Sequence, residues 1–243
     1  MSKHKPELIV ALDVDTLEQT QKLIDILEPS VDFFKVGSQL FTSAGPAAVR
    51  FILARGKKVF LDLKYHDIPN TVASAVRSAV GLSEAVGNKM SKGAGISMLT
   101  VHTQGGEEML KAAAQAAAEK AKALNLPKPL IVGITVLTSE QRKEGTQKLV
   151  LERARLAKSS GLDGVVASIE EAAAICKELG EDFIIVTPGI RPQGSATGDQ
   201  KRAGTPKDAV RAGSNFLVVG RPIIESSDPL GTAKKILEEI RTD

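Results

Sequence analysis

Short apolar runs rich in Val, Ile and Leu alternate along this chain with longer stretches typical of helices. Apolar runs without polar alternation indicate strands buried on both faces, as in a parallel sheet. The first helix is expected to begin after Thr16, a residue type favoured at N-caps, and residues 38–56 are expected to form one helix. The expected strands cover residues 8–14, 33–38, 58–66, 96–103, 130–138, 164–168, 183–190 and 216–224.

The repeat of eight strand–helix units predicts the fold class. Eight such units close into an α/β fold of the (β/α)8 TIM-barrel type, and a barrel of ~250 residues takes up the whole chain. We therefore expect a single catalytic domain over residues 1–243. The alternative, an open doubly wound sheet, carries its glycine fingerprint directly after the first strand. That place in this chain reads ALDVDTLEQ, without glycine.

Two connections are longer than simple turns. Residues 81–95 lead from an expected helix into a strand, which places them on the N-terminal face of a barrel, away from chemistry. Residues 191–204 follow the seventh strand, on the C-terminal face. A polar, Gly-rich loop of this length at the active end is typical of a lid. The alternative is a surface loop without a function.

Charged residues interrupt the apolar strands near their C-terminal ends, where barrel enzymes carry their catalytic groups. They are Asp13, Lys35, Asp62 and Lys64, and Asp67 follows just beyond the third strand. Side chains alternate along a strand, so Asp62 and Lys64 are expected on the same side. Unpaired buried charges cost several kcal/mol, so we predict a network of alternating sign that Asp67 extends. A purely structural salt-bridge network is the alternative, but such networks stabilise poorly.

The same residues argue against a metal site. Mg²⁺ prefers oxygen ligands and spare negative charge, whereas each strand-end aspartate here has a lysine competing for it. The histidines, at positions 4, 66 and 102, lack the spacing of metal ligands. We therefore expect no metal ion.

A phosphate site is expected after the seventh and eighth strands, because the loops there frequently hold phosphate in barrels. Gly220 and Arg221 end the eighth strand. Glycine allows close backbone approach, and a guanidinium matches the geometry of a phosphate. Arg191 and Gln200, in the long seventh loop, are further candidates. The alternative for each arginine is an ordinary surface charge.

Composition excludes several classes of protein. The 32 basic and 29 acidic residues are scattered, Trp is absent and aromatics make up 3%, which argues against nucleic-acid binding. No apolar run approaches the ~18 residues of a membrane span, and MSKHKPELIV does not resemble a signal peptide. The lone Cys176 excludes an internal disulfide and fits a reducing compartment. We expect a cytoplasmic protein that binds no membrane.

Six motifs carry a resemblance to a known family. They are ALDVD, FKVG, FLDLKYHDIPNT, TVLTS, TPGIRPQGSATGDQKR and VVGRPI. In order and spacing they resemble the orotidine 5′-monophosphate decarboxylase family of the bacterial type, over nearly the whole chain, and DLKYHDIPNT is the most specific. The chain departs from the family pattern in the length of 81–95 and at Thr100, where the pattern has Asn before Val-His.

The resemblance implies a barrel homodimer that converts the nucleotide orotidine monophosphate to UMP and CO₂, the last step of de novo pyrimidine synthesis. By position, it implies that Lys64 protonates C6 of the pyrimidine and that Asp62 lies against the substrate carboxylate. Lys35 would bond Asp62 and the ribose. Asp67 and Thr71 would enter the partner subunit's site.

The remaining implied contacts hold the rest of the nucleotide. Asp13 would bind a ribose hydroxyl, and Thr138 would contact the edge of the pyrimidine. The phosphate would be held by Arg191, Gln200, Gly220 and Arg221.

Two other functions compete with this one. Related Mg²⁺-dependent sugar-phosphate decarboxylases and aldolases share the D-x-K-x-x-D motif, but tend to have Glu in place of Lys35. FFKVG and DIPNT therefore argue against them. A non-catalytic barrel that only binds a phosphorylated ligand is expected to have lost one of the catalytic charges, and all are present here.

Overall fold

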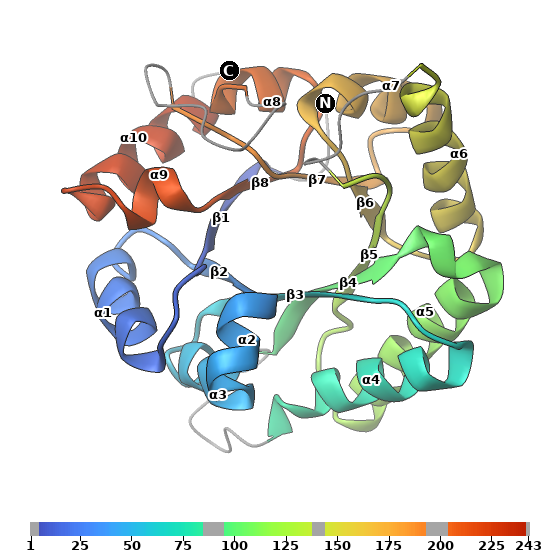
Figure 1. The fold of residues 1–243 in the computed structure, drawn as a ribbon, viewed down its shortest axis with the longest axis horizontal. Helices are drawn as coiled ribbons and strands as arrows, with labels where there is room; N and C mark the ends of the chain where they lie inside the picture. Colours follow the sequence, from blue (N-terminus) through green and yellow to red (C-terminus); the bar gives the residue numbers. More distant parts are fainter. Residues whose placement is uncertain (1–4, 85–94, 138–143, 193–203, 242–243) are drawn as a thin grey trace.

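The computed structural model describes residues 5–84, 95–137, 144–192 and 204–241. Its strands form a closed barrel in which each strand pairs in parallel with the next and β8 pairs with β1, as predicted (Figure 1). Helices surround the barrel on the outside. The strands are β1 (Glu7–Ala11), β2 (Phe33–Gly37), β3 (Lys58–Tyr65), β4 (Ile96–His102), β5 (Leu130–Ile134), β6 (Gly164–Val166), β7 (Ile184–Thr187) and β8 (Phe216–Val219).

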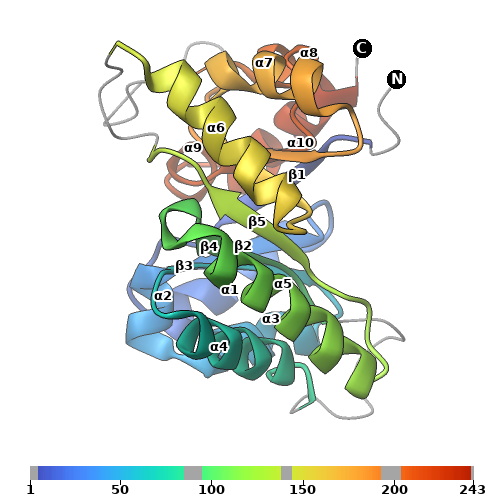
Figure 2. The same ribbon diagram turned by 90° about the vertical axis from the view of Figure 1, so that its right-hand side faces the viewer.

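The helices follow the strands in the expected alternation, and Figure 2 shows them along the side of the barrel. As predicted, Thr16 caps the first helix: its hydroxyl accepts from the backbone N–H of Gln19 at 3.1 Å, and the Gln19 side chain accepts in return from the N–H of Thr16. The helices are α1 (Leu17–Leu27), α2 (Ser38–Ala44), α3 (Pro46–Ala54), α4 (Pro69–Gly81), α5 (Gly106–Ala123), α6 (Thr146–Ser159), α7 (Ile169–Leu179), α8 (Pro206–Arg211), α9 (Arg221–Ile224) and α10 (Pro229–Arg241).

The prediction of a single helix over 38–56 is wrong. The chain divides there into α2 and α3, and Gly45 lies between them at a φ of 56°. This left-handed conformation suits glycine. Pro46 then supplies no backbone N–H for α2 to continue, but its fixed φ suits the first position of α3.

Several predicted strands run too far. β1 ends at Ala11, so Asp13 lies two residues beyond it, and β5 ends at Ile134. β8 ends at Val219, and residues 221–224 form α9. The apolar run of the sequence continues through residues 222–224, but the backbone turns at Gly220 and ends the strand before them.

The core has an outer layer between strands and helices and a smaller one inside the barrel. Alternation along β1 separates them: Val10 packs in the outer layer, whereas Ile9 and Ala11 belong to the inner one. Burial on both faces explains why the strands read as continuous apolar runs. The inner layer contains Ile9, Ala11, Phe33, Phe60, Met98, Val132, Ile184, Val186, Phe216 and Val218.

The N-terminal half of the barrel interior is closed by aromatic packing. Phe33 and Phe216 begin β2 and β8, and their rings meet edge to face with centroids 5.8 Å apart. The open end is therefore the C-terminal one. No helix among the described residues is long and apolar enough to cross a membrane.

Candidate active site

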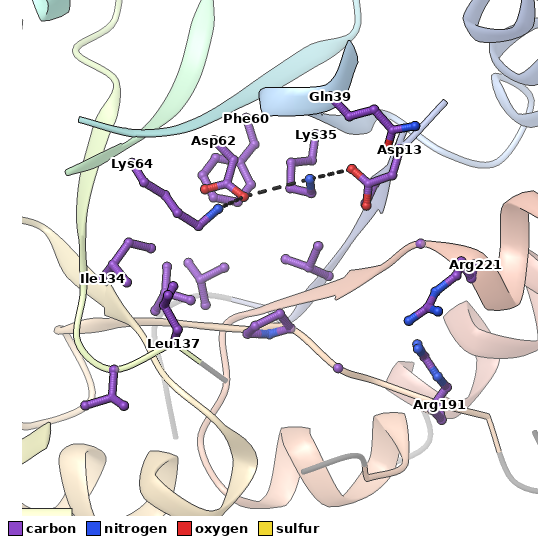
Figure 3. Close-up of a pocket in the computed structure, with 18 of the residues that line it drawn as sticks. Asp13, Lys35, Gln39, Phe60, Asp62, Lys64, Ile134, Leu137, Arg191 and Arg221 are labelled. Carbon is purple, nitrogen blue, oxygen red and sulfur yellow. Dashed lines mark hydrogen bonds and ion pairs between the residues drawn. The ribbon is translucent and has the colours of Figure 1, made fainter. Parts of the chain in front are cut away.

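A cavity of about 560 Å³ lies at the C-terminal ends of the strands, within the usual range for small-molecule sites. Charged side chains from the loop after β1 and from β2 and β3 line one part of it, and arginines after β7 and β8 line another (Figure 3). Apolar side chains, among them Ile134, Leu137 and Val166, cover the region between β5 and β6. The cavity thus combines a charged wall, an apolar wall and a cationic end.

The structure brings together the four charged residues predicted from the first three strands. The ammonium of Lys35 lies 2.9 Å from Asp13 Oδ1 and 3.8 Å from Asp62 Oδ2. The ammonium of Lys64 lies 2.8 Å from Asp62 Oδ2. Figure 3 shows the side chains in a row of alternating charge, from Lys64 to Asp13.

Burial differs along this row. The Lys35 and Asp62 side chains are only 11% and 12% exposed, whereas Lys64 is 38% and Asp13 44% exposed. Charges this deeply buried are tolerated when they are paired. The inner pair is therefore held by its partners, and the outer two groups are accessible to a ligand.

The backbone at Lys64 departs from a regular strand. Leu61 pairs with Leu99 of β4 and Tyr65 with Val101, so residues 62–64 stand opposite Thr100 alone. Lys64 itself has a φ of 52°. That conformation costs a residue with a side chain about 1–2 kcal/mol, and such strain concentrates at functional sites. Asp62 and Lys64 do meet as predicted, but through this bulge rather than by simple strand alternation.

Sequence reasoning missed two residues that support the network. Thr100 accepts a hydrogen bond from the backbone N–H of Lys64 at 2.8 Å and donates one to Asp62 Oδ1 at 3.0 Å. A Cβ at Gly37 would lie 2.7 Å from Lys35 Nζ, so glycine leaves the space that the ammonium occupies. The available signals were a polar residue within an apolar strand and a glycine two positions after Lys35.

The cationic end contains the predicted arginines. Arg191 and Arg221 point toward each other beyond the Asp13 end of the row (Figure 3). Burial lowers the pKa of the Arg191 guanidinium, and the like charge of Arg221 lowers this pKa further. The opposite charge of Glu225 raises it in part. Two converging guanidinium groups suit an anion between them. A Cβ on Gly220 would stand 3.6 Å from Asp13 Oδ2, so this end adjoins the charged row.

Two predicted site residues do not line the cavity, and the prediction that Asp67 extends the charged network is wrong for this subunit. Asp67 and Thr71 are exposed beside the end of β3, and Asp67 Oδ1 accepts from the N–H of Ile68 at 2.6 Å. Two others, Thr138 and Gln200, lie outside the described residues. So do most of the predicted lid, 191–204, and most of the segment 81–95.

The carboxylates of the site are occupied by ammonium groups. Lys35 contacts both Asp13 and Asp62, in the position where a cation shared between the two would sit. Within the described ranges, no three His, Cys, Asp or Glu side chains are grouped so that they could hold a metal ion.

Fold and site together define a (β/α)8-barrel protein with a charged cavity at its strand ends, the architecture of barrel enzymes. The model of the Orotidine 5′-phosphate decarboxylase / HUMPS family matches residues 6–236. The chain belongs to this family, which confirms the resemblance seen in its motifs.

Individual relatives agree with the family model. The chain is 49% identical over 245 residues to the orotidine 5′-phosphate decarboxylase of Moorella thermoacetica, covering 97% of this chain and 92% of that protein. It is 46% identical to that of Syntrophotalea carbinolica, covering 97% and 95%. The crystal structure of the Lactobacillus acidophilus enzyme superposes with a TM-score of 0.81 at 37% identity, covering 98% of this chain and all of that one.

We expect Arg221→Ala to weaken binding of ribose 5-phosphate by at least about tenfold, because a charge-assisted hydrogen bond contributes roughly 1.5–3 kcal/mol. Isothermal titration calorimetry measures this directly. The control is Arg155→Ala, which removes an arginine paired with Glu178 on the outer helices. Equal affinity of Arg221→Ala and the unaltered protein would contradict the assignment of this end to phosphate.

Proposed function

We propose that this chain decarboxylates orotidine 5′-monophosphate to UMP and CO₂, the last step of de novo pyrimidine synthesis. The observation that carries the proposal is the contact of 2.8 Å between Lys64 Nζ and Asp62 Oδ2 at the wall of the cavity. Full-length relatives that are 46% and 49% identical carry the name of this activity.

The chemistry requires a fixed positive charge at one carbon atom. When the bond from C6 to the carboxylate breaks, CO₂ leaves and the electron pair stays in an sp² orbital of C6, outside the π system of the ring. A preorganised charge stabilises such a localised carbanion best. Lys64 in its ammonium form supplies that charge and then transfers a proton to C6. The amine regains a proton from solvent after the product leaves.

The other charged residues prepare this step. Asp62 holds Lys64 in place and faces the carboxylate of the substrate, where like-charge repulsion favours departure of CO₂. This ground-state effect is the smaller one. Lys35 bonds Asp62 and a ribose hydroxyl, and Asp13 binds a second hydroxyl, in keeping with its exposed carboxylate.

The phosphate end contributes binding energy at a distance from C6. Arg191, Arg221 and Gly220 hold the phosphate together with Gln200, and Thr138 contacts the edge of the pyrimidine. Binding energy from a remote group serves catalysis when it orders the reacting groups.

We further propose that the enzyme is a homodimer with shared sites, each barrel being one catalytic domain. Asp67 and Thr71 are exposed and lie outside the cavity of their own subunit. Ile68, between them, is 66% exposed as well. In this proposal, which follows from the family resemblance, Asp67 and Thr71 complete the site of the partner. The single Cys176 supports a reducing, cytoplasmic setting.

The Mg²⁺-dependent reaction of related sugar-phosphate enzymes fits the site less well. Such chemistry needs a cation between carboxylates, and Lys35 stands between Asp13 and Asp62 instead. The proposal is therefore a reaction without metal or cofactor.

The direct test is CO₂ release from orotidine monophosphate by the purified protein, with and without EDTA. We expect equal rates in both conditions. Lys64→Ala should lower turnover at least about a thousandfold, because it removes both the charge and the proton donor, while UMP binding changes far less. The control is Lys58→Ala, at the other end of β3, where the lysine pairs with Glu7.

Loss of activity in EDTA that Mg²⁺ restores would favour the sugar-phosphate class instead. Near-normal turnover of Lys64→Ala would end the assignment of this lysine as proton donor. No CO₂ release by the unaltered protein would refute the proposed activity.

Subunit complementation tests the shared site. Lys64→Ala and Asp67→Ala are each expected to be poorly active alone. In a mixed dimer, one site combines the intact Lys64 of one subunit with the intact Asp67 of the other. Co-refolding equal amounts should restore about one quarter of normal activity, since half the dimers are mixed and each has one intact site. Activity no greater than the mean of the two single variants would contradict shared sites.

A further inference from the structure

Thr100 connects the two central residues of the site without entering the cavity. Thr100 lies within β4 and is fully buried, with 0% of its surface exposed. It is not among the residues that line the cavity. Its hydroxyl contacts the backbone of Lys64 and the carboxylate of Asp62. It therefore touches both groups that the proposed reaction uses, but no substrate.

The bulge in β3 explains why a side chain is needed here. Residues 62–64 stand opposite Thr100 alone, between the pairs Leu61–Leu99 and Tyr65–Val101. The N–H of Lys64 bonds the Thr100 hydroxyl in place of a carbonyl of β4. A buried N–H without a partner costs about 1–3 kcal/mol, so this hydrogen bond offsets part of the cost of the left-handed backbone at Lys64.

The direction of the two hydrogen bonds follows from their donors. A backbone N–H only donates, so Thr100 Oγ1 must accept from Lys64, and its own hydrogen is left for Asp62 Oδ1. An ionised carboxylate only accepts. The two oxygens of Asp62 are thereby divided: Oδ1 bonds Thr100, and Oδ2 faces the ammonium groups of Lys64 and Lys35 at 2.8 and 3.8 Å.

We propose that Thr100 is a positioning residue for the decarboxylation, an inference that rests on the proposed function. The Thr100 hydroxyl fixes the backbone of Lys64, the proposed proton donor. It also fixes the rotation of the Asp62 carboxylate, which holds the Lys64 ammonium. Misplacement of a reacting group by about 1 Å can cost about a hundredfold in rate. Loss of the hydroxyl therefore lowers turnover while the remote phosphate contacts keep nucleotide binding intact.

Two pairs of variants isolate the hydroxyl. Thr and Val have nearly the same shape and differ by a hydroxyl in place of a methyl group, and Ala is Ser without its hydroxyl. We expect kcat of Thr100→Val to be about tenfold to a hundredfold lower than that of the unaltered protein. We expect kcat of Thr100→Ala to be lower than that of Thr100→Ser by the same factor. The inhibition constant of UMP should stay within about threefold throughout, because the phosphate end is unchanged. If Thr100→Val does not fold, the Ser and Ala pair supplies the comparison.

The matched control is Thr103→Val, just beyond β4. Thr103 is also buried, and its hydroxyl donates to the carbonyl of Ile134 at 2.7 Å, away from the charged row. It should lower the melting temperature as much as Thr100→Val does, with little effect on kcat. A kcat lowered as much by Thr103→Val as by Thr100→Val would overturn the proposal. So would a kcat for Thr100→Ala within twofold of that for Thr100→Ser.

A structural readout separates this inference from the proposed function. In a crystal structure of Thr100→Val, or of Thr100→Ala if Val does not fold, we expect Lys64 to leave its left-handed φ or Asp62 to rotate, lengthening the Lys64–Asp62 contact. An unchanged bulge and contact would overturn the role of Thr100 whatever the activity. An unaltered protein that releases no CO₂ would instead refute the proposed function.

Discussion

The pairing of buried charges between β2 and β3 is the constraint on which the site depends. Lys35 and Asp62 are almost fully enclosed, and removing one partner of such a pair leaves a charge that costs several kcal/mol. Their positions are therefore tied to each other and to the register of the strands. The apolar packing around Phe33 and Phe216 below them keeps that register. The packed barrel interior thus supports the charged row at the strand ends, where Lys64 is accessible.

In the proposed reaction, one part of the cavity carries the chemistry and another binds the phosphate. The charged row comes from the ends of the first three strands, whereas the guanidinium groups come from the ends of the last two. Gly220 lies next to Asp13, so the two halves meet where β8 closes onto β1. In the proposed reaction, this arrangement would let a phosphate held beside β8 position the pyrimidine ring beside the charged row.

Much of the fold and of the charged row was predictable from the sequence. Continuous apolar strands, the Thr16 cap and the order of the four charges follow from local patterns that the structure confirms. The break at Gly45 was visible as Gly-Pro but was outweighed by the apolar spacing around it. The left-handed Lys64 and its bond to Thr100 were not predictable, because a bulge depends on pairing with a distant strand. The exposed position of Asp67, outside the cavity, was likewise not predictable from the pattern of charges along the sequence.

Solvent hydrogen exchange at C6 of UMP tests the central claim most directly, because protonation of the C6 carbanion can run in reverse. With the unaltered protein in D₂O, we expect the C6 proton signal of bound-and-released UMP to decay, and Lys64→Ala to exchange at least about a hundredfold more slowly. The claim predicts this difference even without the carboxylated substrate. Exchange no faster than in buffer, or equal exchange by both proteins, would contradict a localised carbanion stabilised and protonated by Lys64.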